Sequence, residues 1–418
     1  MASVKMKLKH LYYGWVVVLI SACILATHSF VIYTFGIFLR PLTIEFDWGR
    51  GALSGAFSMS MLLAGILAIF AGRFSDKYGP RVLVTLTGLF AGIGFLLMSR
   101  INSLWEVYLI WGSFMGVGGG CCLIPVLSTI PKWFEKKRGI AVGITVAGFG
   151  LGAIISPTLA QWLISSYGWQ QAYIILGLIT IIIIIPLAQF LKHSPQRMGL
   201  KPYGESEAIQ DKQSSASTRG LSFKQAIKTG RFWVFGLIHF CFIFCLQVII
   251  VHVAPYAVDI GILAIVAASI LSIIAGSSVI GKFFMGFISD RVGGRLALSA
   301  CLIQATLALI WLLFAKEIWM FYLFAVVFGF AYGGIVSLLT VVAAELFGLK
   351  FLGVIFGSAF VLGSAGGALG PLLAGTIFDI TGGYSLALLI CVILGTLAII
   401  LGLILLRYKI REGDVVSA

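Results

Sequence analysis

One charged side chain lies deep inside an apolar stretch of this sequence, and it is Lys282. A charged side chain at the centre of a bilayer costs about 3 kcal/mol or more, so such residues mark functional sites. No Asp or Glu lies deep in any apolar run to neutralise the ammonium group. The pattern therefore predicts that Lys282 binds the carboxylate of a small molecule; the alternative is a structural lysine bonded to backbone carbonyl groups. The positions that share its helix face are small or polar, namely Ala275, Ser278, Gly286 and Ser289.

A second candidate group lies near one end of the apolar run 232–258. There His252, Tyr256 and Asp259 are spaced i, i+4 and i+7, so they share one face of a helix. Because histidine gains or loses a proton near neutral pH, His252 and Asp259 are candidates for proton coupling, and His252 also for substrate binding. A histidine that only packs between helices is the alternative, and the sequence leaves both open.

Further side chains inside apolar runs are candidates for lining a shared cavity. Tyr332 stands in the stretch FGFAYGGIVS, at the place that Gly118 occupies in the first half of the chain, which predicts an asymmetric cavity. Packing is the alternative for each of them, and His239 is interpreted as structural. Besides Tyr332, the candidates are His28, Tyr33 and Phe360.

Composition and length define the elements that must hold these side chains. Of the 418 residues 60% are apolar and 11% charged, whereas about a quarter are charged in soluble domains, so a soluble enzyme is excluded. Runs such as 174–187 and 386–406 are apolar on every face, unlike the alternating strands of a membrane barrel. With about 20 residues for each spanning helix, the sequence predicts an all-α polytopic membrane protein with twelve spans: 14–39, 52–71, 82–99, 104–130, 139–164, 169–191, 232–258, 262–288, 297–315, 318–344, 352–378 and 384–407.

The polar tract GESEAIQDKQSSASTRG divides these spans six plus six. We therefore predict bundles at 1–191 and 231–418, joined by a cytoplasmic linker at 192–230. Nearly all of the 29 lysines and arginines fall on one side, which places that side and both termini in the cytoplasm of a multi-pass protein of the cell membrane. The net charge of +14 is thus topological, and nucleic-acid binding is not expected. The exceptions are Arg40, Arg50, Arg100 and Lys316 outside, and Lys282 within the membrane.

The two halves match each other when the chain is shifted by 214 positions. One register persists across five spans, so the chain is interpreted as a duplication. Two halves with an even number of spans are related by an axis along the membrane normal, with a binding site expected between them near mid-membrane. Pairs in this register include Pro41 with Pro255, Gly119 with Gly333, Gly139 with Gly353, and Pro157 with Pro371.

Two loops carry the most specific motif. GRFSDKYGPR at 72–81 and GFISDRVGGR at 286–295 resemble the loop hallmark of the major facilitator superfamily. That resemblance implies twelve helices in two pseudo-symmetric six-helix bundles that alternate their access. It also implies that these loops form a cytoplasmic gate, with the pairs Asp76 and Arg81, and Asp290 and Arg295.

Other stretches resemble the bacterial monocarboxylate transporter and oxalate/formate antiporter branch: YGWVVV, KWFEKKRGIAVGITVAGFGLG, SPQRMGLKPYG and HVAPYAVDIGI. This resemblance implies a carrier of lactate-like or pyruvate-like monocarboxylates together with a proton, and Tyr33 matches an aromatic position of that family's cavity. The family usually has arginine where this chain has Lys282. Because lysine, unlike arginine, can lose its proton when buried, we hypothesise that Lys282 takes up a proton together with the anion.

Alternative functions lack the residues they require. Exchange of dicarboxylates in the oxalate manner is the nearest rival, but it would be expected to use two membrane cations, and the span 352–378 has no Lys or Arg. Sugar transport is disfavoured because the single asparagine, Asn102, lies in a loop. Enzyme motifs are missing, and the seven cysteines lack metal-ligand spacing, so no catalysis, metal or cofactor is expected. The expected partners are a small carboxylate, a proton and the lipid bilayer, with the protein a monomer.

Overall fold

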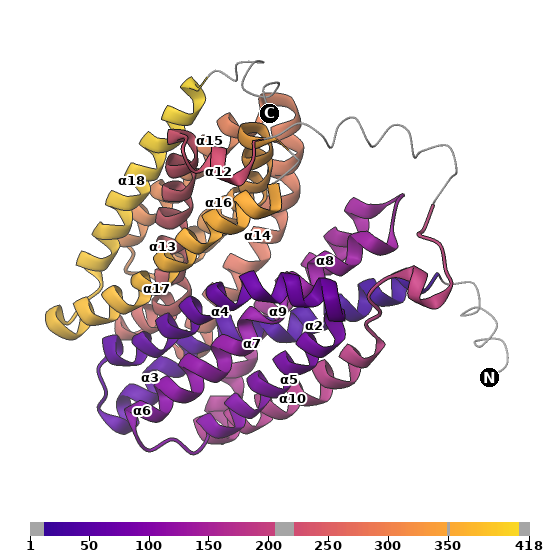
Figure 1. Ribbon diagram of the computed structural model, residues 1–418. Helices are drawn as coiled ribbons and strands as arrows, with labels where there is room; N and C mark the ends of the chain where they lie inside the picture. Colours follow the sequence, from indigo (N-terminus) through magenta and orange to yellow (C-terminus); the bar gives the residue numbers. More distant parts are fainter. Residues whose placement is uncertain (1–11, 205–220, 349–351, 409–418) are drawn as a thin grey trace.

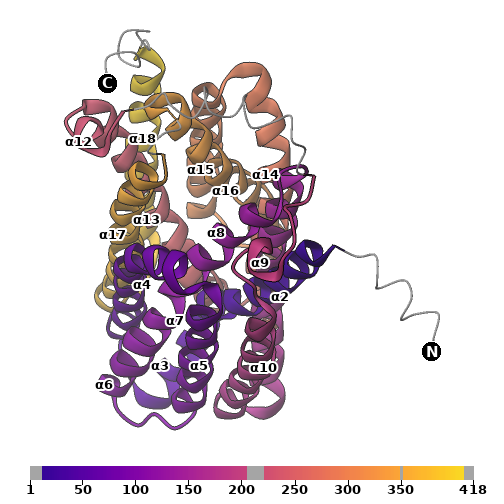
Figure 2. The ribbon, with the colours of Figure 1, turned by 45° about the vertical axis from the view of Figure 1, so that its right-hand side comes forward.

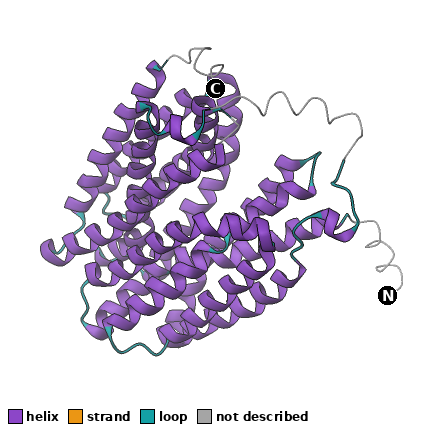
Figure 3. Cartoon of the chain, in the orientation of Figure 1, coloured by secondary structure: helices purple, strands orange, loops and turns teal. Residues whose placement is uncertain are grey.

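The computed structural model describes residues 12–204, 221–348 and 352–408. Figure 3 shows that the described chain is almost entirely helical, and none of its residues form a strand. Within these described ranges, twelve helical segments are long and apolar enough to cross a membrane, which confirms the predicted number of spans and the all-α fold. A lone β-bridge joins Phe134 to Tyr203, where the segment after the sixth span meets the end of the fourth.

The first six spans form one bundle, drawn in indigo to magenta in Figure 1. Each long helix is apolar over most of its surface, as expected where lipid covers one side and other helices the rest. The helices of this half are α2 (Tyr13–Tyr33), α3 (Phe35–Phe46), α4 (Arg50–Tyr78), α5 (Pro80–Met98), α6 (Leu104–Val107), the π-helix η1 (Tyr108–Met115), α7 (Gly116–Gly120), α8 (Leu123–Trp133), α9 (Arg138–Tyr167), α10 (Trp169–Phe190) and the short 3₁₀ turn η2 (Pro195–Met198).

The fourth span is broken, which the sequence analysis did not predict. It passes from α6 through η1 to α7, turns at Cys121 and Cys122, and continues as α8. Glycines in α7 have low helix propensity. Pro125 has no N–H to donate to the carbonyl of Cys121, so the helix ladder is interrupted at this point.

The last six spans form the second bundle, drawn in red to yellow. The short helix α12 precedes it, and Leu221 beside α12 donates its backbone N–H to the carbonyl of Phe347 at 2.9 Å. The described parts of the predicted linker are thus each fixed to the bundle nearest to them in sequence. The helices are α12 (Phe223–Ala226), α13 (Gly230–Asp259), α14 (Ala264–Val292), α15 (Gly294–Leu313), α16 (Ile318–Phe347), α17 (Leu352–Thr381) and α18 (Ser385–Arg407).

The two bundles meet where α4 packs on α17, α9 on α14 and α3 on α13, as Figures 1 and 2 show from two directions. Contact is tight near the start of α4, where a Cβ atom on Gly51 would lie 2.7 Å from the backbone nitrogen of Thr376. The hydroxyl of Ser58 donates to the carbonyl of Ala368 about two turns further along α4. We call this end of the interface the closed end.

The opposite end of the same helices is open. A Cβ atom on any of five glycines there would meet nothing within 4 Å, although these glycines belong to helices that pack tightly at the closed end. This open end is also where α10 ends and α13 begins, so it carries the described parts of the predicted linker. The five glycines are Gly139 and Gly143 of α9, Gly286 of α14, and Gly353 and Gly357 of α17.

Candidate functional site

Three predicted site residues come together between the bundles. The Nζ atom of Lys282 in α14 lies 5.8 Å from the ring centroid of Tyr332 in α16. The hydroxyl of Tyr332 is in turn 3.1 Å from the hydroxyl of Tyr33 at the end of α2. Both tyrosines are buried, with 2% and 7% exposure for Tyr33 and Tyr332, whereas Lys282 is half-buried. We call Lys282, Tyr332 and Tyr33 the central cluster.

The central cluster lies near mid-membrane. Tyr332 has 14 residues of α16 before it and 15 after it, so at 1.5 Å per residue it stands about 20 Å from either end. Tyr33 belongs to the first bundle, while Tyr332 and Lys282 belong to the second, so their contact crosses the pseudo-symmetry boundary. The rings of Phe149 and Phe242 lie 6.2 Å from those of Tyr33 and Tyr332, respectively, and provide apolar walls.

The central cluster offers one cation and two hydroxyl groups. Among the described residues no carboxylate lies within ion-pair distance of Lys282, so its ammonium group has the Tyr332 ring as its nearest charge-stabilising neighbour. Such a group can bind a single carboxylate, and the hydroxyls can donate to or accept from it. The described residues contain no group of His, Cys, Asp and Glu that could hold a metal ion.

The other predicted lining residues have side-chain hydrogen bonds or ring contacts outside this cluster, or no such contact among the described residues. The Ser278 hydroxyl donates to the carbonyl of Ala275 on its own helix, at 2.7 Å. Phe360 packs edge-on against His239 at 5.8 Å, and its ring is partly exposed on α17. His28 is buried in α2, and its Nδ1 has no partner among the described residues.

His252 and Asp259 lie at the closed end instead. Phe242 marks the level of the central cluster on α13, and His252 is ten residues further, or about 15 Å along the helix. The structure therefore separates His252 from the central cluster, and its part in substrate binding stays a prediction. The physical reason is that the face shared by His252 and Asp259 meets the start of α4 and the end of α17.

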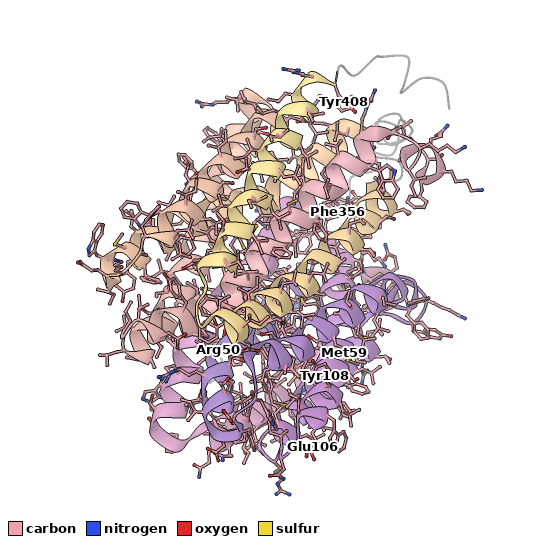
Figure 4. All side chains as sticks on the ribbon, turned by 90° about the vertical axis from the view of Figure 1, so that its left-hand side faces the viewer. Arg50, Met59, Glu106, Tyr108, Phe356 and Tyr408 are labelled. Atoms are coloured by element: carbon pink, nitrogen blue, oxygen red, sulfur yellow. The ribbon has the colours of Figure 1, made fainter. Side chains whose placement is uncertain are left out.

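Arg50, the first residue of α4, connects the groups of the closed end. Its Nη1 and Nη2 donate to the two carboxylate oxygens of Asp259 at 2.5 and 2.8 Å. Nη1 also donates to the hydroxyl of Tyr384 at 2.8 Å, and the guanidinium lies 3.8 Å from the ring centroid of Phe378. Figure 4 shows Arg50 where the purple first bundle meets the yellow and pink helices of the second. One arginine of the first bundle thus fastens two segments of the second.

A second carboxylate and a histidine complete this arrangement. Asp379 accepts from the backbone N–H groups of Arg50 and Gly51, both at 2.8 Å, which places its negative charge at the start of helix α4. Nδ1 of His252 is 3.1 Å from the hydroxyl of Tyr384, and Nε2 is 2.9 Å from the carbonyl of Pro371. We call Arg50, Asp259, Asp379, Tyr384 and His252 the outer network.

Tyr384 is the neutral bridge of the outer network. It lies between the last two spans, and burial raises the pKa of its phenol above the usual value, although the positive charge of Arg50 opposes this effect. The phenol therefore keeps its proton and can donate one hydrogen bond while it accepts another.

Sequence reasoning missed Arg50, Asp379 and Tyr384. Arg50 was counted only as one of the few basic residues on the outer side, and that rarity was the available signal. Its partners are 209 to 334 positions away in the chain, a separation that no periodicity reveals.

The predicted gate loops at the open end show different partners from those expected. Arg81 donates through Nε to Gln189 at 2.7 Å, and Arg295 pairs through Nε with Glu345 at 3.3 Å. In this open state Arg295 thus pairs with Glu345 on the neighbouring helix and Asp290 is exposed, so the expected pairing of Arg295 with Asp290 stays a prediction. The side chain of Asp76 lies outside the described part of the structure. Each arginine joins helices of its own bundle, so the gate function stays a prediction.

A sequence model of the Major Facilitator Superfamily matches residues 21–294 and 257–416, which together cover most of the chain. The chain belongs to the major facilitator superfamily. This confirms the resemblance carried by the two loop motifs, and it identifies the protein as a multi-pass membrane transporter of this superfamily.

Curated relatives place this transporter near carriers of carboxylates. Monocarboxylate transporter 13 of Rattus norvegicus is 26% identical over 379 residues, covering 89% of this chain and 84% of the relative. The oxalate:formate antiporter of Oxalobacter formigenes is 27% identical over 285 residues, covering 67% of this chain and 64% of the relative. The uncharacterized MFS-type transporter YcxA of Bacillus subtilis (strain 168) is 26% identical over 388 residues, covering 89% and 90%.

A solved structure supports the fold. A bacterial homolog of the human lysosomal transporter Spinster, in an inward-facing and occupied conformation, superposes with a TM-score of 0.76. It shares 16% sequence identity and covers 97% of this chain and 99% of its own. At this identity the likeness concerns the superfamily fold alone.

Proposed function

We propose that this transporter carries small monocarboxylates of the lactate and pyruvate type across the cell membrane, together with a proton, by alternating access. The observation that carries the proposal is Lys282, a membrane-embedded cation without a carboxylate partner among the described residues, beside two buried tyrosine hydroxyls. A single carboxylate would complete the charge of this site, and the apolar rings around it suit a short carbon chain.

The position of the central cluster suits alternating access. A carboxylate held by Lys282 and Tyr332 would also contact Tyr33 of the other bundle, so a bound substrate would interact with both halves of the protein. The basic side of the chain, and hence the open end, faces the cytoplasm by the charge rule, which makes this structure open to the inside. We propose that both termini also lie on that side.

Proton coupling follows from the choice of lysine. When the empty transporter changes conformation, a charged Lys282 would be buried without a counter-ion in the state that is closed on both sides. Lysine can release its proton and then regain it with the anion, whereas arginine stays charged. The proton and the anion together cross without net charge.

The test is uptake of labelled L-lactate into proteoliposomes, with and without an inward proton gradient. Loss of a charged hydrogen bond costs about 2 kcal/mol, so Lys282→Ala should weaken lactate binding about 30-fold. The matched control is Lys316→Ala, at an exposed lysine in the loop between α15 and α16, which should transport normally. Lys282→Arg should retain binding but lose most of its dependence on the proton gradient.

Two outcomes contradict this proposal. Lactate uptake that is unchanged in Lys282→Ala would exclude the lysine as the anion site. Uptake that ignores the gradient but rises with oxalate or another carboxylate inside the vesicles would instead indicate an exchanger of the oxalate:formate type.

A further inference from the structure

The hydrogen bonds of the outer network fix one protonation state of His252. Nε2 of His252 lies 2.9 Å from the carbonyl of Pro371 and 3.4 Å from the hydroxyl of Ser54. A carbonyl oxygen only accepts, and a hydroxyl can accept as well, so Nε2 bears a proton that it donates to the nearer Pro371. Arg50 only donates, so the Tyr384 hydroxyl accepts from it and directs its own proton to Nδ1 of His252, at 3.1 Å. The donors and acceptors agree only if His252 is neutral and its Nδ1 is an acceptor.

A second proton on His252 would break this agreement. With Nδ1 protonated, Arg50 and His252 would both donate to the Tyr384 hydroxyl. Among the described residues, the Tyr384 proton would then have no other hydrogen-bond partner. The imidazolium would also stand one hydroxyl away from the Arg50 guanidinium. His252 is only 2% exposed in this state, so water cannot compensate for either effect.

The surrounding charged groups do not offset this conflict. Asp259 on the same helix and Asp379 on α17 lie beyond Arg50, and each carboxylate already accepts two hydrogen bonds from Arg50 or its neighbour Gly51. The ring of Tyr256 packs on Tyr384, while its hydroxyl is directed to the carbonyl of Ala315. On α3, which packs on the same part of α13, the charged residues Arg40 and Glu45 are exposed. The nearest charge to His252 is therefore the positive charge of Arg50.

We infer that His252 is a pH-sensitive switch of the outer network. Protonation of its Nδ1 separates Tyr384 from Arg50 and favours the state in which this end of the transporter is open. The inference goes beyond the carboxylate site and rests on the proposed function only through alternating access. Protons on the outer side hold the outer end open, and closure of that end releases one proton from His252.

The inference predicts the size of the pH effect. The outer-open state binds one proton more than the outer-closed state, so the ratio of open to closed protein rises at most tenfold for each unit of decreasing pH. The rise begins where a water-accessible histidine titrates, near pH 6.5, and continues as the pH falls further.

The experiment measures distances between spin labels in nanodiscs, with no carboxylate present. One pair of labels, on Asn102→Cys and Lys316→Cys, reports the outer end, and both positions are exposed loops of different bundles. The exposed Cys23 is replaced by serine to remove a competing label site. The inference expects the outer distance to be short at pH 8 and long in an increasing fraction of molecules towards pH 5.

Variants separate His252 from other titrating groups. His252→Gln keeps an N–H donor for Pro371 but cannot titrate, so the outer end should stay closed at pH 5. His239→Gln is the matched control, because His239 is a buried histidine on the same helix outside the network, and it should respond like wild type. Tyr384→Phe removes the bridge and should lengthen the outer distance already at pH 8.

A wild-type outer distance that does not change between pH 8 and pH 5 overturns the inference, as does a full response in His252→Gln. If that variant does not fold, a short outer distance at pH 8 in Tyr384→Phe overturns it as well. The labels report only whether the outer end is open, so a failure of lactate transport leaves this result intact. A wild type that transports lactate with a proton, but whose outer distance is the same at pH 8 and pH 5, refutes the His252 inference alone.

Discussion

The tight contact at Gly51 allows a quantitative prediction about the conformational equilibrium. A Cβ atom on Gly51 would lie 2.7 and 2.8 Å from the nitrogen and Cα atoms of Thr376, which are backbone atoms of α17 and cannot rotate away. Ordinary contacts between such atoms are about 3.5 Å or longer. Gly51→Ala therefore forces α4 and α17 apart by roughly 0.7 Å at this point.

That displacement weakens neighbouring hydrogen bonds as well. The carboxylate of Asp379, one turn from Thr376, accepts from the backbone N–H groups of Arg50 and Gly51 at 2.8 Å, and both bonds would lengthen. Overpacking typically costs 1 to 3 kcal/mol, so we take about 2 kcal/mol against the outer-closed state. The ratio of outer-open to outer-closed protein should therefore rise about 30-fold.

The assay is the outer label pair on residues 102 and 316 at pH 8, where the wild type is expected to be closed. Gly143→Ala is the control, because a Cβ atom there meets nothing within 4 Å and should leave this state unchanged. Equal outer distances in Gly51→Ala and wild type would refute the reasoning, since they would mean that α17 moves aside without raising the free energy of the outer-closed state.

Two further predictions concern stability. Tyr33→Phe and Tyr332→Phe should each lower the unfolding free energy by about 1 kcal/mol, because each removes the hydroxyl contact of 3.1 Å. The double variant should lose about as much as one single variant, since both substitutions remove the same contact. Thermal unfolding in detergent measures these losses, and additive losses would contradict the prediction. Glu345→Ala should cost about 1 kcal/mol and lower the Tm, since Glu345 accepts from Gly294 N–H at 2.9 Å and pairs with the partly buried Arg295. Glu45→Ala, at an exposed position of α3, is the control, and equal Tm values for the two variants would disprove the role of Glu345.

The spanning helices and the main site candidate were predictable from patterns along the chain. Twelve spans follow from apolar runs, because a backbone in lipid must satisfy its own hydrogen bonds and a helix does so locally. Lys282 was recognisable as a site candidate because the cost of placing a charge in the membrane can be judged from the apolar run around it, without knowledge of other helices. The repeated loop motifs indicated the superfamily without any knowledge of contacts.

Which polar residues act together, in contrast, depends on how the helices pack. Tyr33 and Tyr332 were separate candidates until the fold brought their hydroxyls within 3.1 Å, across 299 positions of sequence. His252 shares a helix face with Asp259, as predicted, but the neighbours of that face are Arg50 and Tyr384 of other segments. Helix periodicity fixes which side chains share a face, whereas the packing of helices from both bundles decides what that face meets.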